Sequence, residues 1–304
     1  MPDPDPSAPD LVEFSPPAAG LRGRLASLGG KRRPLVAVAA VAVIGLVVAL
    51  AVTRPSGGRA GDASAARADP GLAKLIAQVT NVPVRTSEAA GDGGGQVTAK
   101  PVPVTGPPLA ANGAPEVFYA GTEYCPYCAA QSWAMIVALS RFGTFRGLRT
   151  IVSGDYPPCP YLAAWTFYRS AYASRYVTFV PVETRSNVLI SPTADPRSGE
   201  SYTGLQKMTA AQQAVFSRYD RARAFPFADF GNRYVLVGAG FPPMFLEQLT
   251  WREVAASLRN PYSMTGQAIL GAANYVTAAI CQLTAGRPAS VCTPAVRSLV
   301  APAN

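Results

Sequence analysis

The sequence predicts an α/β domain, a mixed sheet flanked by helices with extensions at both ends, behind one N-terminal transmembrane helix. Three observations favour this class. Strand-like and helix-like segments alternate from about residue 115 to 259, long additional segments lie on either side of them, and an uncharged apolar run covers residues 34–53. With 304 residues, of which 49% are apolar, the chain is long enough to form one sizeable globular domain.

The composition excludes several classes of function. The chain contains no histidine, which removes the usual general base and with it Ser-His-Asp or Cys-His catalysis and His-based zinc or copper chemistry. Its net charge of +9 is carried by 23 Arg and 4 Lys, which are scattered rather than clustered among aromatic residues. We therefore expect no nucleic-acid partner, because an arginine-rich solvated surface accounts for the charge.

The first 69 residues divide into three segments by composition. Residues 1–33 predict a disordered cytoplasmic tail, residues 34–53 are long enough to cross a lipid bilayer as a helix, and residues 54–69 predict a flexible linker. Lys and Arg are concentrated before the apolar run, which predicts a single-pass protein of the cell membrane with a cytoplasmic N-terminus and an extracytoplasmic C-terminal domain. A cleaved signal peptide is the alternative, although the apolar run is longer than a usual signal core.

Residues 70–304 are predicted to form one extracytoplasmic domain with extensions at both ends. Apolar residues at three- and four-residue spacing after Pro70 predict a short helix, and the Gly- and Pro-rich stretch up to Pro115 predicts extended chain. A strand is expected at 116–121, a helix from the CxxC motif to about 142, strands at 148–153 and 176–183, a polar loop at 185–204 and a helix at 206–223. The strand at 148–153 is interpreted as an apolar run of the kind expected of a buried central strand.

The C-terminal part carries clear local signals. Residues 225–238 alternate, turn at Gly231-Asn232 and alternate again, which predicts a β-hairpin with Pro226 at its start, where a cis bond is tolerated. A capping box from Thr250 to Glu253 predicts the start of a helix. A last helix is expected at 265–284, and its polar residues favour a buried helix over a second membrane span.

The pair Cys125 and Cys128, separated by Pro126 and Tyr127, is the most informative motif. It opens a helix, where unpaired N–H groups and a partial positive charge favour a thiolate. Cys125 is then the attacking sulfur of a disulfide exchange and Cys128 the resolving one. Half of a zinc site and an inert pair are the alternatives, but a zinc site needs further Cys or His ligands at matching spacing. We expect no metal ion and no cofactor.

Residues around the motif are further candidates. Glu123 is a candidate proton acceptor when the resolving cysteine attacks, which requires a buried carboxylate with a raised pKa; a surface glutamate is the alternative. Tyr124, Tyr127 and Phe225 are candidate substrate-binding residues, forming with Trp133 an apolar rim for unfolded polypeptide. Packing of these aromatic residues in the core is the alternative.

The remaining three cysteines lie apart from the motif. Cys281 falls in the last turn of the last predicted helix and Cys292 in the loop after it, so a returning segment would join them in a structural disulfide worth about 3 kcal/mol. Two free buried thiols are the alternative. Cys159, among prolines, is either a lone buried thiol or a third partner in exchange or in an intermolecular cross-link.

The order of these elements resembles that of the thioredoxin superfamily over about residues 115–259. The resemblance implies that Pro226 lies in the cis-proline loop next to the dithiol, where its backbone pairs with the substrate. The tetrad from Cys125 to Cys128 is similar to that of glutaredoxins, whereas Phe225 replaces the Thr or Val common before that proline.

A closer similarity, from about Leu72 to Cys292, is to an uncharacterised family of membrane-anchored thioredoxin-like proteins, domain of unknown function 929. It is carried by the segments 123–130, 138–145, 226–237, 272–275 and 279–281. Because no activity is established for this family, the similarity implies a fold and an anchor but no reaction.

These observations together predict a membrane-anchored extracytoplasmic thiol–disulfide oxidoreductase that acts on thiols or disulfides of exported proteins, with a membrane redox partner as a further expectation. Oxidase, reductase and isomerase all stay open, because their potentials depend on thiolate stability. The alternative from another class is a redox-inert thioredoxin-like adaptor that binds an envelope partner through residues 70–115 and 261–304.

Overall fold

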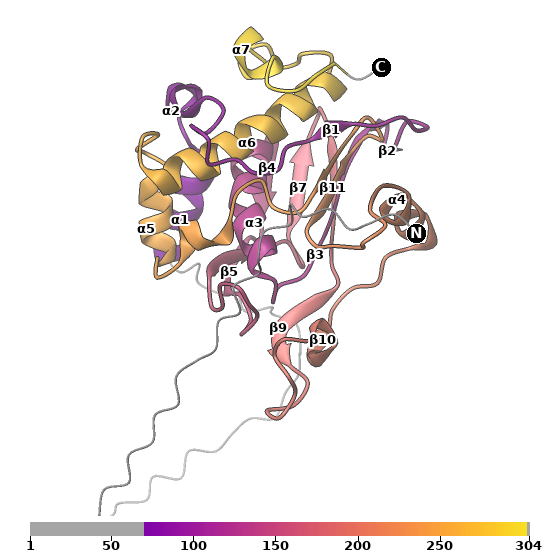
Figure 1. Ribbon diagram of the computed structural model, residues 1–304. Helices are drawn as coiled ribbons and strands as arrows, with labels where there is room; N and C mark the ends of the chain where they lie inside the picture. The colour runs from indigo at the N-terminus through magenta and orange to yellow at the C-terminus, as the bar shows by residue number, and fades with distance from the viewer. Residues whose placement is uncertain (1–69, 303–304) are drawn as a thin grey trace, which may run out of the picture. The chain divides into compact units, whose positions relative to one another are not determined.

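The computed structural model describes residues 70–302, in which helices and strands alternate along the chain (Figure 1). The α-helices are α1 (Pro70–Thr80), α2 (Val84–Ala90), α3 (Pro126–Leu139), α4 (Ala210–Tyr219), α5 (Trp251–Ser257), α6 (Met264–Leu283) and α7 (Pro294–Arg297), with short 3-10 helices at Gly199–Ser201 and Pro243–Leu246. The strands are β1 (Val102–Pro103), β2 (Ala110–Ala111), β3 (Ala114–Gly121), β4 (Gly143–Arg146), β5 (Arg149–Val152), β6 (Ala163–Thr166), β7 (Ala171–Ser174), β8 (Thr178–Glu183), β9 (Arg185–Leu189), β10 (Tyr202–Gly204), β11 (Phe227–Phe230) and β12 (Tyr234–Val237).

A six-stranded mixed sheet organises this part of the chain. Its order is β1-β12-β11-β3-β2, and β8 pairs with β3 in addition. The β3–β8 pair is parallel and the other pairs are antiparallel. The remaining described strands form three two-stranded sheets, β4–β7, β5–β6 and β9–β10. The central strand β3 lies between β11 and β8 and leads directly to the CxxC motif.

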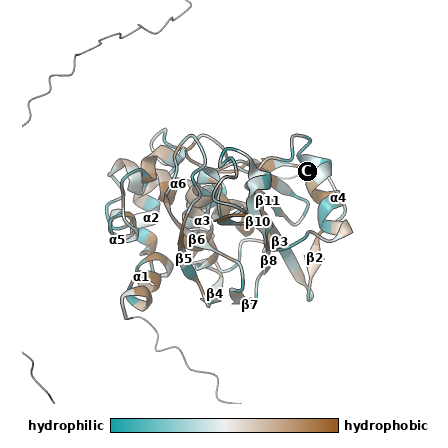
Figure 2. Ribbon diagram, turned by 90° about the horizontal axis from the view of Figure 1, so that it is seen from below, coloured by the Kyte–Doolittle hydropathy of each residue, from teal (hydrophilic) through white to brown (hydrophobic). Residues whose placement is uncertain are grey.

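The two faces of the sheet bury separate apolar cores. Alternate residues of β3 point to opposite faces, so Val117 and Tyr119 join the larger core while Phe118 and Ala120 join the smaller one. Helices α1, α2, α3, α5 and α6 lie on one side of the strands and α4 on the other (Figure 2). On the side of the larger core, every residue of α3 from Cys128 to Leu139 is buried.

The predicted fold class, a thioredoxin-like domain with a transmembrane helix, is wrong as stated. The structure shows a mixed α/β fold with a mixed sheet and helices, and among residues 70–302 there is no helix whose length and apolar character would let it cross a membrane. The apolar helix α6 is instead packed against α3, with polar residues such as Asn274 and Thr277 bonded inside the protein. The predicted span at 34–53, like the predicted tail and linker, lies outside the described residues.

Most predicted elements are confirmed, and three predictions are wrong. The stretch up to Pro115 is not all extended chain, because the helix α2 occupies Val84–Ala90. The helix after Pro70, the strand–CxxC–helix unit, the hairpin β11–β12, the capped helix α5 and the last helix α6 are present. The strand at 148–153 does not enter the central sheet, because β5 pairs with β6 in a separate sheet and is only half buried. The segment 185–204 is not a simple polar loop but contains the β9–β10 hairpin, since the buried ring of Tyr202 anchors it to the protein.

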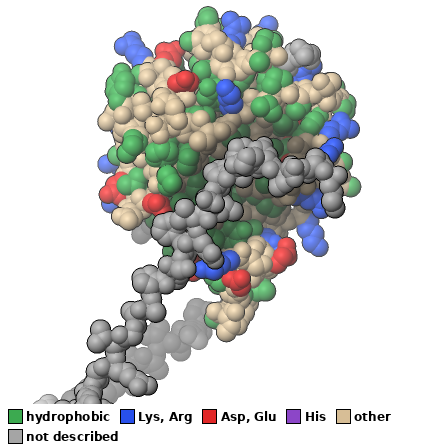
Figure 3. All heavy atoms as spheres, in the orientation of Figure 1, with side chains coloured by type: hydrophobic (Ala, Val, Ile, Leu, Met, Phe, Trp, Pro, Cys, Tyr) green, Lys and Arg blue, Asp and Glu red, His purple; other side chains and the backbone are tan. Residues whose placement is uncertain are grey.

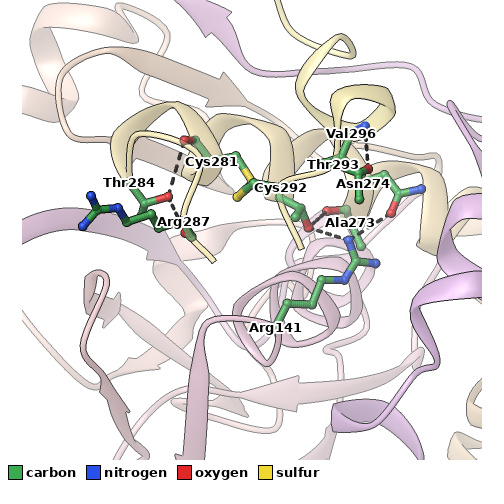
Figure 4. Close-up of a disulfide and its surroundings, with 10 residues drawn as sticks. Arg141, Ala273, Asn274, Cys281, Thr284, Arg287, Cys292, Thr293 and Val296 are labelled. Carbon is green, nitrogen blue, oxygen red and sulfur yellow. Dashed lines mark hydrogen bonds between the residues drawn. A yellow bond between two sulfur atoms is a disulfide. The ribbon is translucent and has the colours of Figure 1, made fainter. Parts of the chain in front are cut away.

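The C-terminal end of α6 is fixed by a disulfide between Cys281 and Cys292, whose Cα atoms are 5.5 Å apart (Figure 4). Beside it, the guanidinium of Arg141 donates to Asn274 Oδ1 at 3.0 Å and Thr277 Oγ1 at 2.6 Å, and also to Ser87 Oγ at 2.6 Å. These bonds join the segment after α3 to α2 and α6. The C-terminal part of α6 is thus held by the disulfide and by the hydrogen bonds of Arg141.

Replacing both Cys281 and Cys292 with serine should lower the free energy of unfolding by about 3 kcal/mol, because the unfolded chain regains the entropy of an open loop. Urea denaturation of the variant and of the oxidised wild type measures the difference. Reduced wild type should match the variant, and equal stability of the oxidised and reduced wild type would contradict the prediction.

Candidate functional site

The CxxC motif lies at the junction of β3 and α3. Cys125 is the N-cap residue of α3, with extended backbone angles of −77° and 127°, and Pro126 occupies the first helical position. Proline is favoured there because its missing N–H would have no partner inside the helix. The side chain of Cys125 therefore lies at the end of the helix where the N–H groups of the first turn are unpaired. Both sulfurs are largely covered, since Cys125 is 7% and Cys128 4% exposed.

The loop before β11 lies against the first cysteine. The Phe225–Pro226 peptide bond is cis, and the thiol of Cys125 donates to the carbonyl oxygen of Phe225 at 3.8 Å. The register of β11 on β3, with Phe227 opposite Ala120, brings this loop to the end of β3. The structure thus places the Phe225–Pro226 loop beside Cys125.

Cys128 lies deeper than Cys125, at the base of the motif. The backbone N–H of Thr122 donates to Cys128 Sγ at 3.4 Å, and the Thr122 hydroxyl is 4.0 Å from the same sulfur. Tyr119 of β3, which precedes Thr122, is fully buried nearby. Burial, followed by the negative charge that Cys128 carries when ionised, raises the pKa of the Tyr119 phenol well above its ordinary value. Neither Thr122 nor Tyr119 was among the predicted site residues.

The two thiols are electrostatically different. The pKa of Cys125 is lowered, first because the Cys128 thiol donates to its thiolate and also because the N–H groups of Cys128 and Tyr127 point to it, although burial acts in the opposite direction. The pKa of Cys128 is raised well above its ordinary value by burial and by the nearby Cys125 thiolate. Cys125 is therefore the thiol that ionises more readily and Cys128 the one that holds its proton more tightly, and their roles in disulfide exchange stay a prediction.

Two buried carboxyl groups accompany the dithiol. Glu123, the predicted proton acceptor, is buried, and its Oε1 accepts a hydrogen bond of 2.6 Å from the Thr166 hydroxyl. Glu183, at the end of β8 and opposite Gly121 of β3, accepts a weak bond from the Phe167 N–H at 3.4 Å. Its second oxygen has no hydrogen-bond partner in the described part of the chain.

Glu183 is the functional candidate that sequence reasoning missed. Burial, followed by repulsion from Glu123, raises its pKa to about 8. Its charge in turn contributes to the raised pKa of Cys128, so the two groups lie within electrostatic reach. The available signal was a glutamate that ends an apolar strand predicted to lie in the same sheet as the strand before Cys125.

The predicted aromatic rim is only partly formed. Tyr124 stacks on Tyr202 with ring centroids 4.3 Å apart, and Phe225 stacks on Phe216 at 5.4 Å, so both face protein on one side. Tyr127, inside the motif, is 41% exposed. Trp133 is fully buried in the core and takes no part. Tyr127 is therefore the predicted substrate contact that most clearly faces solvent.

The third free cysteine, Cys159, is buried in the loop between β5 and β6. Burial, followed by the neighbouring Glu247, raises its pKa to about 11, so this thiol is protonated at neutral pH. Among residues 70–302 no group of three Cys, Asp or Glu side chains is arranged to hold a metal ion.

The family profile described as Domain of unknown function (DUF929) matches residues 100–195. This segment contains the dithiol, Glu123 and Glu183, whereas Pro226 lies beyond it. No curated protein and no solved structure matches the chain. A DUF929 domain is thus found over this segment rather than over the longer one predicted from the sequence, and the match carries no activity.

Alkylation of Cys125 should proceed with a midpoint pH below 9, the ordinary value for a cysteine, because its thiolate is stabilised. Rates of reaction with iodoacetamide across pH, followed by peptide mass spectrometry, measure the midpoint. Cys128→Ala removes the first of the stabilising groups and should move the midpoint upward. An unchanged midpoint in that variant would contradict the assignment.

Glu183 should make folding stability depend on pH. Its pKa of about 8 exceeds the ordinary 4.5, so the folded state binds the proton more tightly than the unfolded state. Stability should be full below about pH 4.5 and should fall by up to about 5 kcal/mol as pH rises to about 8.

Urea denaturation of Glu183→Gln tests this dependence. The loss of stability between about pH 5 and about pH 8.5 should be smaller in Glu183→Gln than in the wild type. Glu88→Gln, at an exposed side chain, is the matched control and should behave as the wild type. Parallel pH curves for wild type and Glu183→Gln would refute the prediction.

Proposed function

We propose that the protein is an extracytoplasmic thiol–disulfide oxidoreductase that acts on exported proteins through Cys125 and Cys128. The observation that carries this proposal is the asymmetric dithiol. Cys125 has a lowered pKa at the N-terminus of α3 and contacts the carbonyl before cis-Pro226, while Cys128 beneath it has a raised pKa. A nucleophile next to a protonated resolving thiol is the arrangement that exchange through a mixed disulfide needs.

The reaction runs in two balanced steps. The Cys125 thiolate attacks one sulfur of a substrate disulfide, which forms a mixed disulfide and releases the other substrate sulfur as a thiolate. Cys128 then loses its proton and attacks Cys125 Sγ, which forms the Cys125–Cys128 disulfide and releases the second substrate thiolate. The substrate gains two electrons and the protein dithiol loses two; the reverse sequence oxidises a substrate dithiol.

Glu183 is the group best suited to accept the proton that Cys128 loses in the second step. A base whose pKa is near the working pH accepts a proton efficiently, and the pKa of Glu183 is about 8. Its unpartnered oxygen keeps an acceptor site available within the buried region. Glu123, the other buried carboxyl, raises the pKa of Glu183 and so contributes to this role.

Two further observations support the proposal. The combination of a dithiol at a helix start with a cis-proline loop is similar to the redox site of the thioredoxin superfamily. The disulfide between Cys281 and Cys292 supports an extracytoplasmic compartment, because cytosolic thiols are kept reduced. Attachment to a membrane and a membrane redox partner stay predictions that rest on residues 34–53, outside the described part.

The redox-inert adaptor is the second candidate, and the low exposure of both sulfurs favours it. An adaptor would keep the motif as a structural element and bind its partner elsewhere. The two candidates differ in one measurable property, the reactivity of Cys125 toward a protein disulfide.

Insulin, whose disulfides a protein thiol can attack, serves as the test substrate. Reduced Cys128→Ser should form a mixed disulfide with insulin at Cys125, because the resolving thiol is gone. Cys125→Ser should react at least about 100-fold more slowly, since the stabilised thiolate is removed. Intact-mass spectrometry measures both products.

Cys159→Ser is the control variant and should react like the wild type, because the protonated thiol of Cys159 is not part of the motif. If folded Cys128→Ser fails to couple to insulin through Cys125, the oxidoreductase proposal is wrong and the adaptor is favoured.

A further inference from the structure

The β9–β10 hairpin leaves the central sheet beside the dithiol. β3 and β8 are parallel, with Gly121 opposite Glu183, so their ends lie at the same edge of the sheet. The CxxC motif follows β3 and the hairpin follows β8. The backbone N–H of Glu123 donates to the Arg185 carbonyl at 2.8 Å, which ties the start of the hairpin to the motif. In Figure 1 the hairpin projects from the lower end of the sheet.

The hairpin is held in a defined position rather than attached only at its base. Tyr202 of β10 stacks on Tyr124, the residue directly before Cys125. The Arg185 guanidinium donates to the Tyr202 carbonyl at 2.9 Å and forms an ion pair with Glu200. The side-chain amide of Asn187 donates to the Val152 carbonyl at 2.8 Å. These contacts orient the outer face of the hairpin relative to Cys125.

That outer face carries large apolar side chains. Val188 is 60% and Ile190 65% exposed, whereas Leu189 between them is half buried, as alternation along a strand predicts. The Ile190 N–H donates to the Ser201 carbonyl at 2.8 Å, so the ladder continues through this residue. The two exposed side chains therefore lie next to each other on one ordered surface.

Neighbouring segments extend this surface toward the dithiol. Tyr127 is 41% exposed within the motif, and Tyr161 is 63% exposed in the loop between β5 and β6. That loop contacts the motif, since the Gly154 N–H donates to the Tyr124 carbonyl at 2.9 Å, and Tyr161 lies within electrostatic reach of Tyr202. Figure 3 shows the hairpin with apolar side chains among polar ones. Three segments that meet at Tyr124 thus each expose a large apolar or aromatic side chain.

We propose that the outer face of the β9–β10 hairpin, with Val188 and Ile190, is the docking surface for an extended apolar polypeptide segment next to the client's cysteine. This inference rests on the proposed function. A client whose sulfur reaches Cys125 has its flanking residues at the edge of the sheet where the hairpin stands. Apolar flanking residues would cover the two exposed aliphatic side chains, and this burial favours apolar over polar clients.

Two peptide probes test the proposal on the full-length Cys128→Ser protein. Each has a single cysteine as a mixed disulfide with thiopyridine, flanked in one peptide by Leu and Val and in the other by Ser and Asn. Absorbance of the released thiopyridone gives the rate of attack by Cys125. The full-length Cys128→Ser protein, the parent of the variants below, should react about tenfold faster with the apolar peptide than with the polar one. Only the apolar peptide can bury the two exposed aliphatic side chains.

Val188→Asp combined with Ile190→Asp should abolish this preference, since charge replaces the apolar face. Tyr262→Asp combined with Met264→Asp is the matched control, because it removes another exposed pair of large apolar side chains, two residues apart at the start of α6, and it should keep the tenfold preference. If the hairpin variant keeps the preference, the docking surface is wrong. Circular dichroism and the rate with the polar peptide show that the variant is folded.

A binding measurement separates failure of this inference from failure of the proposed function. A fluorescent apolar peptide with serine in place of its cysteine should bind the parent and the control, and about tenfold more weakly the hairpin variant, by anisotropy. Equal binding to all three proteins overturns the docking surface. Hairpin-dependent binding without any reaction of either thiopyridine peptide keeps the docking surface and overturns the exchange chemistry.

Discussion

The pairing of β3 with β11 is the interaction on which the rest of the site depends. It places Phe227 opposite Ala120, so that the loop with cis-Pro226 ends beside the first residues after β3. The same register sends Tyr119 to one core and Phe118 to the other. A slip by one residue would exchange the two faces and move the Phe225 carbonyl away from Cys125. The geometry of the dithiol and the packing of both cores are therefore fixed by one set of strand contacts.

Burial makes the site's chemistry possible and costs stability. The low-dielectric interior favours the neutral forms of Glu183, Cys128 and Tyr119, and it therefore raises the pKa of each group. Cys125 differs because it lies at a helix start where N–H groups and the second thiol stabilise its anion. The fold thus places one ionisable thiol at the boundary of a region that keeps its neighbours protonated.

The features that the sequence could predict are those with local signals. The CxxC helix start, the β11–β12 hairpin and the capping box at Thr250 each occupy a few consecutive residues, and all are present. The pairing of Cys281 with Cys292 spans a separation of 11 residues and was within reach of the same reasoning.

Features that depend on contacts between distant segments could not be predicted. The position of Glu183 next to the dithiol requires β8 to lie parallel to β3, which brings Glu183 opposite Gly121. The β9–β10 hairpin is stabilised by Tyr202 against Tyr124, so its polar composition alone indicated a loop. The interpretation of Leu148 to Val152 as an apolar central strand overlooks Arg149 and Thr150, and short runs do not distinguish a central strand from an outlying one.

The parallel β3–β8 pair explains why chemistry and proposed recognition share one edge. Both strands end there, so segments that follow them meet without a long connection, and the cysteines and the hairpin arise from two such segments. The disulfide and the Arg141 contacts instead hold α6, on which neither cysteine of the motif is built. If the proposed docking holds, changes in the exposed residues of the hairpin alter which polypeptides dock, while the strand register that positions Cys125 stays intact. The proposed recognition and the dithiol geometry thus depend on different contacts.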